Sequence, residues 1–275
     1  MTVTASGTIV LEGVLQRERL VLAISLAAVV GLAWAWLLLG AGTGMSALSI
    51  SGDHAMSGMA HAMMQPVVWT PGYAALMFAM WWVMMAAMML PSAAPMLLLF
   101  ARIHRGERAG GRSYVPTGIF AAGYLAVWGG FSALATAAQW GLQQIDLLSP
   151  MMATSSQMLA AAILIGAGAW QLTPIKRICL QHCRSPLGFL ATSWRRGKLG
   201  AFRMGLDHGS YCLGCCWFLM GLLFVGGIMN LFWIAALAVF VLIEKVLPFG
   251  SWVGRIAGVG AIAWGTAMLM NATIF

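Results

Sequence analysis

The sequence predicts an all-α fold, a polytopic membrane helical bundle of about seven transmembrane helices whose N-terminus is cytoplasmic. Hydrophobic residues make up 61% of the chain and charged residues only 8%, whereas soluble domains contain about half and about a quarter. Apolar runs recur throughout residues 1–275, which indicates a single integral membrane domain surrounded by lipid. The net charge of +8 indicates topology rather than a nucleic-acid partner, because all 15 Lys and Arg residues are expected on the cytoplasmic side or at that end of a helix.

The first apolar run, Leu20–Leu39, is long enough to cross a bilayer and too long for the apolar core of a signal peptide. The following segment, residues 39–72, contains no Lys or Arg and is expected to be an outward loop. Imidazole and thioether side chains gather there: His54, Met56, Met59, His61, Met63 and Met64. Such groups can capture copper in an oxidising compartment, where thiols do not stay reduced. The alternative is a linker with incidental methionines.

The second predicted helix, Tyr73–Phe100, is rich in methionine, of which the whole chain has 21. Helical spacing distributes these methionines over two adjacent faces, with Met77, Met80, Met84 and Met88 on one and Met85 and Met89 on the other. Methionine stripes are commonly adaptable core packing, so packing and a soft-metal path both remain open. Pro91 and Pro95 kink the helix, which membrane helices tolerate where neighbours satisfy the freed carbonyls.

The middle of the chain alternates predicted helices with connecting segments of different charge. The predicted helices cover residues 115–140 and 157–172, and the second is rich in small residues that allow close helix packing. Arg and Lys are frequent in residues 101–114 and 173–205 and absent from residues 141–156. Because basic segments stay on the cytoplasmic side, residues 173–205 are expected to form a basic cytoplasmic loop.

This basic segment also contains a compact thiol–imidazole trio, Cys179, His182 and Cys183, within the sequence C-L-Q-H-C. The trio is a candidate inner acceptor for a soft metal at the cytosolic face. Its C-x-x-x-C spacing alone is a weak signal.

A denser group of cysteines lies in the fifth predicted helix, residues 206–229, which begins L-D-H-G-S-Y-C-L-G-C-C-W. On a helix, His208, Cys212 and Cys215 fall within about 60° of each other, and Cys216 lies about 80° from His208. Thiolates and imidazole on one face suit Cu(I) or Zn(II) far better than Mg or Ca. The alternative is packing, since buried cysteine behaves as a small hydrophobic residue.

The last two predicted helices cover residues 231–246 and 252–270, and the second contains the small-residue packing motif G-R-I-A-G. Two acids, Asp207 and Glu244, are expected at or near the inner edge of the membrane. Ionisable groups at membrane depth are commonly functional, although groups this close to the interface can also extend into water.

Depth arithmetic places the sulfur atoms of two helices at a similar level. At about 1.5 Å per residue, Cys212 to Cys216 lie roughly 9–15 Å from the inner end of their helix. Met88 lies roughly 18 Å from the inner end of its own helix. Thiols and thioethers are therefore expected to share one layer in the inner half of the bilayer.

Two motifs resemble a bacterial family of unknown function described as predicted metal-binding integral membrane proteins. They are W-W-V-M-M-A-A-M-M-L-P-S-A-A-P, residues 81–95, and G-L-D-H-G-S-Y-C-L-G-C-C-W, residues 205–217. The resemblance covers the second to the seventh predicted helix and implies a multi-pass protein of the bacterial inner (cytoplasmic) membrane with a suspected metal. Carried over residue by residue, it points to Met84, Met85, Met88, Met89, Pro91, Gly209, Cys212, Cys215, Cys216 and Trp217.

The leading hypothesis is therefore soft-metal handling in the membrane, with a copper ion, Cu(I), favoured over zinc or mercury. Import, delivery to a metalloprotein partner and a holding site all remain open. The second hypothesis is a thiol-dependent or metal-dependent redox enzyme, in which His208 is one turn from Cys212. The chain has no GxSxG, HExxH or phosphate-loop motif. A structural assembly subunit with Cys and Met as packing is the third.

Overall fold

The computed structural model describes residues 5–41, 68–109, 116–149 and 152–272, and this part of the chain is helical and contains no β-strand. Its helices are α1 (Ala5–Leu38), α3 (Pro71–Ala109), α4 (Thr117–Gln144), α5 (Gln157–Leu172), α6 (Pro174–Arg184), α7 (Pro186–Ser193), α8 (Gly197–Gly221), α9 (Leu223–Gly226), α10 (Leu231–Val246) and α11 (Gly250–Ala272). The all-α prediction is confirmed. The predicted capture residues His54, Met56, Met59, His61, Met63 and Met64 lie outside the described residues.

The number of possible spans is lower than the prediction of about seven. Within the described residues, five helices are long and apolar enough to cross a membrane, or six spans if the bent pair α5–α6 counts as one. A helix does lie at each predicted position, but α5 and α10 have only 16 residues each. Sixteen residues extend about 24 Å, which is less than the roughly 30 Å of a bilayer's hydrocarbon core.

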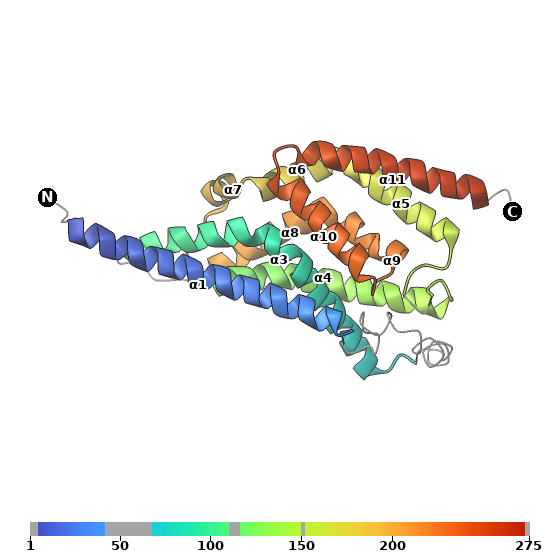
Figure 1. Cartoon of the computed structure of the whole chain (residues 1–275), viewed down its shortest axis with the longest axis horizontal. Helices are drawn as coiled ribbons and strands as arrows, with labels where there is room; N and C mark the ends of the chain where they lie inside the picture. Colours follow the sequence, from blue (N-terminus) through green and yellow to red (C-terminus); the bar gives the residue numbers. More distant parts are fainter. Residues whose placement is uncertain (1–4, 42–67, 110–115, 150–151, 273–275) are drawn as a thin grey trace.

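The helices run roughly along the long axis of the molecule and pack in neighbouring pairs (Figure 1). The main pairs are α1 with α3, α3 with α4, α4 with α8, and α5 with α11. α10 packs against α3, and α6 packs against α8. The interior prolines Pro91 and Pro95 lie within α3, which changes direction along its length in Figure 1.

Glycines allow two of these pairs to approach closely. A Cβ atom at Gly123 of α4 would collide with the carbonyl oxygen of Phe202 in α8. In the α5–α11 pair, a Cβ at Gly168 would lie 2.5 Å from the carbonyl oxygen of Gly258. The small residues singled out in these two helices therefore lie at a helix–helix contact, as small residues do in membrane bundles.

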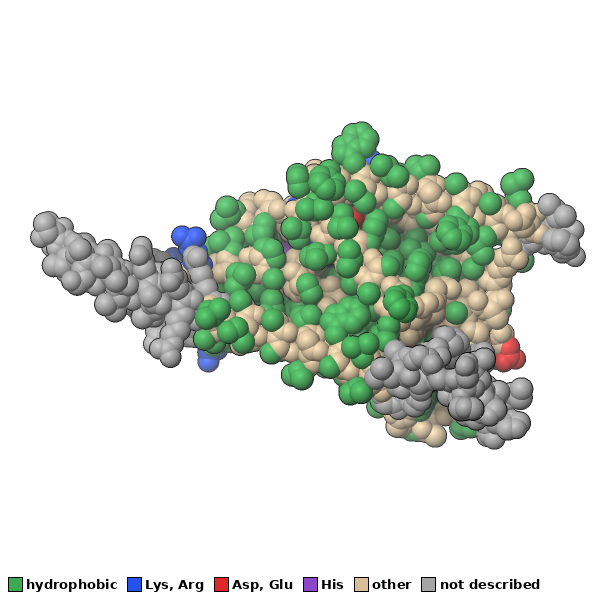
Figure 2. All heavy atoms as spheres, viewed as in Figure 1, with side chains coloured by type: hydrophobic (Ala, Val, Ile, Leu, Met, Phe, Trp, Pro, Cys, Tyr) green, Lys and Arg blue, Asp and Glu red, His purple; other side chains and the backbone are tan. Residues whose placement is uncertain are grey.

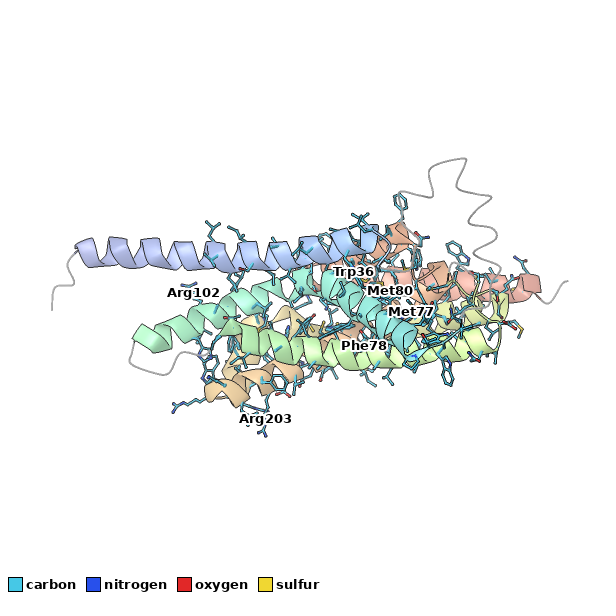
Figure 3. All side chains as sticks on the ribbon, turned by 90° about the horizontal axis from the view of Figure 1, so that it is seen from below. Trp36, Met77, Phe78, Met80, Arg102 and Arg203 are labelled. Carbon is cyan, nitrogen blue, oxygen red and sulfur yellow. The ribbon has the colours of Figure 1, made fainter. Side chains whose placement is uncertain are left out.

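The core is rich in methionine, while the surface is unusually apolar. Met77 and Met80, labelled in Figure 3, are fully buried along α3. Outside, Leu32, Phe232 and Trp264 are 72%, 91% and 68% exposed, and green apolar side chains cover much of the face in Figure 2. An exposed apolar surface of this extent is typical of a protein that faces lipid.

The basic segment 173–205 is largely helical rather than an extended loop. It contains α6, α7 and the beginning of α8. Thr173 caps α6 by accepting a hydrogen bond from the Lys176 backbone N–H, and Pro174 occupies the first turn. The consequence is that residues of this segment have fixed positions against the main bundle.

Candidate metal centre

The four candidate ligands of α8 all point into the protein. Cys212, Cys215 and Cys216 are at most 1% exposed, and His208 is 3% exposed. They share one face because the helix repeats every 3.6 residues. The face is buried because α4 packs closely along α8 through Gly123 and Gly205.

Among the buried thiols, Cys212 is the one that contacts a charged side chain and a hydroxyl group. Its Sγ lies 2.9 Å from Nζ of Lys245 in α10 and 3.0 Å from the hydroxyl oxygen of Tyr124 in α4. The Lys245 ammonium also donates to Oγ of Ser92 in α3, at 3.2 Å. An ammonium in contact with a sulfur stabilises negative charge on that sulfur, and a thiolate is the form that binds metal.

Cys216 meets a methionine from the neighbouring part of the bundle. Its Sγ lies 4.0 Å from Sδ of Met89 in α3. Two sulfur atoms that are each about 2.3 Å from one ion, and about 120° apart around it, are separated by about 4.0 Å. The spacing of this thiol–thioether pair therefore suits a soft ion held between the two helices.

The candidate inner trio does not stay together. Cys183 of α6 lies near Cys212 and Cys215, so it is a neighbour of the thiols of α8. Cys179 lies over Gly214, where an added Cβ would be 2.9 Å from the Cys179 sulfur. His182 turns away.

The imidazole of His182 stacks on Tyr211, with ring centroids 4.2 Å apart and planes 5° from parallel. Its Nδ1 is 2.9 Å from the carbonyl oxygen of Ile178. His182 therefore fixes α6 against α8, while Cys183 supplies a fourth thiol to the cluster. We call Cys183, Cys212, Cys215 and Cys216 the thiol cluster.

His208 lies one turn before Cys212, inside an aromatic cage. Its ring is 6.0, 5.9 and 5.4 Å from the rings of Phe120, Tyr124 and Phe189. Its Nδ1 is buried and has no hydrogen-bond partner. A buried imidazole nitrogen without a partner is unusual. It can accept or donate a hydrogen bond or bind a metal.

The two candidate acids have different environments. Glu244 forms a buried ion pair with Lys176, whose Nζ is 2.7 and 2.8 Å from the two carboxylate oxygens. Gly254 of α11 makes room for that carboxylate, because a Cβ there would collide with it. Asp207 instead pairs with Arg195 at 3.1 Å, and the two side chains are 39% and 47% exposed.

The methionines of α3 do not contribute equally. Met84, Met85 and Met88 are buried in the core with Met89, but the sulfur–sulfur contact with the cysteines involves Met89. A helix turns by 100° per residue, so one methionine of a run faces α8 while the others pack elsewhere.

The sulfur atoms are close but do not already enclose an ion. Among the described residues, no group of three or more His, Cys, Asp or Glu side chains has the arrangement of a metal site. The thiols of Cys215 and Cys216 each donate to the carbonyl oxygen of Cys212, at 3.0 Å. Rotation about χ1 would release both bonds and free the sulfurs to bind an ion.

Sequence reasoning missed Lys245, Tyr124 and Lys176 as neighbours of this site. The signal for Lys245 was its place beside Glu244 in an otherwise apolar helix. Nothing in the sequence singled out Tyr124.

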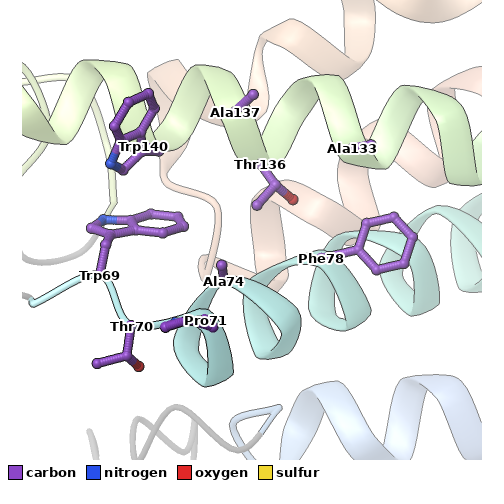
Figure 4. A pocket seen from close by; sticks show the side chains of 9 residues that line it. All are labelled: Trp69, Thr70, Pro71, Ala74, Phe78, Ala133, Thr136, Ala137 and Trp140. Atoms are coloured by element: carbon purple, nitrogen blue, oxygen red, sulfur yellow. The ribbon is translucent and has the colours of Figure 1, made fainter.

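A cavity of about 450 Å³ lies away from the cysteines, near the beginning of α3. Trp69 and Trp140 face each other across it, with Phe78 and Thr136 further along (Figure 4). Its lining contains no sulfur and no imidazole. The cavity therefore does not offer a second soft-metal site.

Comparison with known protein families matches residues 78–268 to the family PpoB2, described as copper chaperone. The match spans most of α3 through most of α11, and it includes the thiol cluster, Met89, Tyr124 and Lys245. Curated proteins and solved structures give no match. The predicted link to a metal-handling family is thereby confirmed for copper.

Proposed function

We propose, from the premise that this chain belongs to the PpoB2 copper chaperone family, that it holds Cu(I) between α3 and α8 for delivery to a metalloprotein. The observation that carries the proposal is the Met89–Cys216 sulfur pair, 4.0 Å apart, beside the other thiols of the cluster. Cu(I) prefers thiolate and thioether ligands, and a site closed off by apolar helices protects it from water and oxidants.

The ligand set follows from these contacts. Met89 and Cys216 hold the ion, and Cys212, Cys215 or Cys183 completes a two- or three-sulfur site after rotation of its side chain. Lys245 balances the negative charge of the thiolates, so the cluster does not carry an uncompensated charge inside the bundle. His208 lies one turn from Cys212 and can serve as an additional ligand.

Delivery is favoured over import by the position of Cys183. This thiol belongs to α6, a short helix at the edge of the bundle, whereas the other thiols belong to α8. An ion can move from α8 to Cys183 by exchange of one sulfur ligand at a time. Cys183 and Cys179 are both half-buried, which makes α6 the place where a partner's ligands would take the ion.

The setting we propose is the bacterial inner membrane, with lipid around the bundle and the basic end in the cytoplasm. The apolar helices and the exposed apolar surface support this setting. In Figure 2, most Lys and Arg side chains on the visible face gather toward one end, and an acidic side chain projects at the other. That asymmetry agrees with the positive-inside rule.

A second function is favoured by one observation, the contact of Lys245 with Cys212. An ammonium beside a thiol also activates catalytic cysteines, so a thiol redox enzyme would use the same pair. In that case Cys212 reacts rapidly with alkylating agents and copper does not protect it.

The decisive experiment measures Cu(I) bound to the purified full-length protein and the number of sulfur neighbours by X-ray absorption. We expect near-stoichiometric copper with two or three sulfurs at about 2.3 Å. The triple variant Cys212→Ser/Cys215→Ser/Cys216→Ser should lose the metal. Retention of copper by this variant would exclude the proposed site.

A further inference from the structure

A second cavity lies between α6 and the beginning of α11. It is on the side of α6 opposite the cysteines of α8. Its volume is about 420 Å³. Three arginines dominate the lining, together with two serines, a glutamine and a leucine: Arg177, Leu180, Gln181, Arg184, Ser185, Ser251 and Arg255. No acidic side chain lines the cavity.

No carboxylate of the described residues neutralises these arginines. In the described part of the chain, the ion pairs involve other cations, and neither Arg177 nor Arg255 pairs with a carboxylate. Arg184 is held in place, because one of its terminal nitrogens donates to the carbonyl oxygens of Leu247 and Pro248, at 2.7 and 3.0 Å. Its remaining N–H groups are free to bind a ligand.

Apolar residues that are next in sequence to lining residues are exposed. Ile178, Trp252 and Ile256 are 53%, 63% and 70% exposed, and the Arg255 guanidinium lies 5.1 Å from the centre of the Trp252 ring. Guanidinium groups bind phosphate oxygens in pairs, and the neighbouring apolar side chains offer a surface to hydrocarbon chains. The arginines fit the anionic head of an amphiphile, and the apolar side chains fit its hydrocarbon part.

We propose that this cavity binds the phosphate headgroup of an anionic phospholipid, with its acyl chains lying on Trp252 and Ile256 of α11. Basic pockets on the cytoplasmic side of membrane helices bind such headgroups. A zwitterionic choline lipid is disfavoured, because its ammonium would approach three arginines. The inference goes beyond copper handling and does not require it.

The test uses the full-length protein in detergent and native mass spectrometry with added phosphatidylglycerol or phosphatidylcholine. We expect the wild type to retain phosphatidylglycerol at least about tenfold more tightly than phosphatidylcholine, a difference of about 1.4 kcal/mol. The variant Arg177→Gln/Arg255→Gln should abolish this preference. The control Arg102→Gln/Arg203→Gln removes the same charge at exposed sites, labelled in Figure 3, and should keep it.

Three outcomes would overturn the proposal. The first is an equal loss in the pocket variant and the control, which indicates unspecific charge attraction. The second is no loss in the pocket variant. The third is displacement of the lipid by millimolar inorganic phosphate, together with tight binding of phosphate alone, which assigns the site to free phosphate. Arg177→Lys/Arg255→Lys keeps the charge and should retain partial preference, and it serves as the second test should the glutamine variant not fold.

Discussion

The ammonium nitrogen of Lys245 lies 2.9 Å from the sulfur of Cys212, although both side chains are buried. A buried cation requires a partner, and Lys245 contacts both Cys212 and Ser92. The hydroxyl of Tyr124 contacts the Cys212 sulfur in turn. The contact means that negative charge can form on the thiol cluster before any metal arrives. It links α10 to the candidate metal centre.

Lys245→Met keeps the length of the side chain and removes its charge. We expect the Cu(I) affinity to fall by about 10- to 100-fold, because a charge-assisted contact contributes about 1.5–3 kcal/mol. Competition with a coloured Cu(I) chelator measures the change. Lys245→Arg is the control and should keep most of the affinity, while an unchanged affinity in Lys245→Met would show that the ammonium does not act on the bound ion.

Met89→Leu removes one sulfur with little change of volume. The Cu(I) affinity should drop about tenfold or more, and X-ray absorption should count one sulfur fewer at the ion. The free energy of unfolding should change by less than about 1.5 kcal/mol, because leucine replaces methionine well in cores. Met158→Leu changes an exposed methionine and should leave copper binding as it is; an equal effect of both variants would contradict the role of Met89.

Mild oxidation of the metal-free protein should join Cys183 to Cys212 or Cys215. The reason is that these thiols lie near each other although α6 and α8 are separate helices. Peptide mass spectrometry identifies the pair, and bound Cu(I) should suppress it. Exclusive pairing of Cys183 with Cys179, its neighbour in C-L-Q-H-C, would mean that Cys183 does not reach the cluster.

Glu244→Gln leaves the charge of Lys176 buried without its partner. Breaking a buried ion pair on one side lowers the free energy of unfolding by about 3–5 kcal/mol, so a large loss of thermal stability is expected. Asp207→Asn is the matched control, because its pair with Arg195 is exposed and is worth about 0–1 kcal/mol. Similar melting temperatures for the two variants would argue that the Glu244–Lys176 pair is open to water.

Gly123→Ala and Gly130→Ala compare two glycines of the same helix. An added methyl group at Gly123 meets the backbone of α8, whereas no atom lies within 4 Å of a Cβ at Gly130. The first variant should separate α4 from α8 and destabilise the protein, while the second should be neutral or stabilising by up to about 1 kcal/mol. Thermal unfolding monitored by circular dichroism provides the measurement.

The sequence was sufficient to predict the helices and the shared face of His208, Cys212 and Cys215, because hydropathy and helical spacing are local properties. It also predicted that the sulfurs of α3 and α8 lie at a similar depth, and the structure brings Met89 to Cys216. Which methionine faces α8 depends on the rotation of α3 in the bundle. That rotation is set by packing against α1, α4 and α10, and no local pattern encodes it.

Two other features depend on tertiary structure alone. The sequence predicts a separate acceptor site for Cys183, because the basic residues around it indicate a loop. Lys245 reaches Cys212 because α10 lies against α3 and carries the lysine inward, although hydropathy favours a charged residue at a helix end in water. Spatial neighbours that are far apart in sequence were therefore the part that sequence patterns could not supply.

The bend of 66° between α5 and α6 sets the helix that carries Cys183 at an angle to its neighbour in the chain. Cys183 is attached to the rest of the cluster through contacts of α6, namely the His182–Tyr211 stack and the anchoring of Arg184. A swing of this short helix about Thr173 would withdraw one sulfur while the three cysteines of α8 stay where they are. Loading and release of the ion would then depend on a change at one bend in the backbone, without any rearrangement of the long helices.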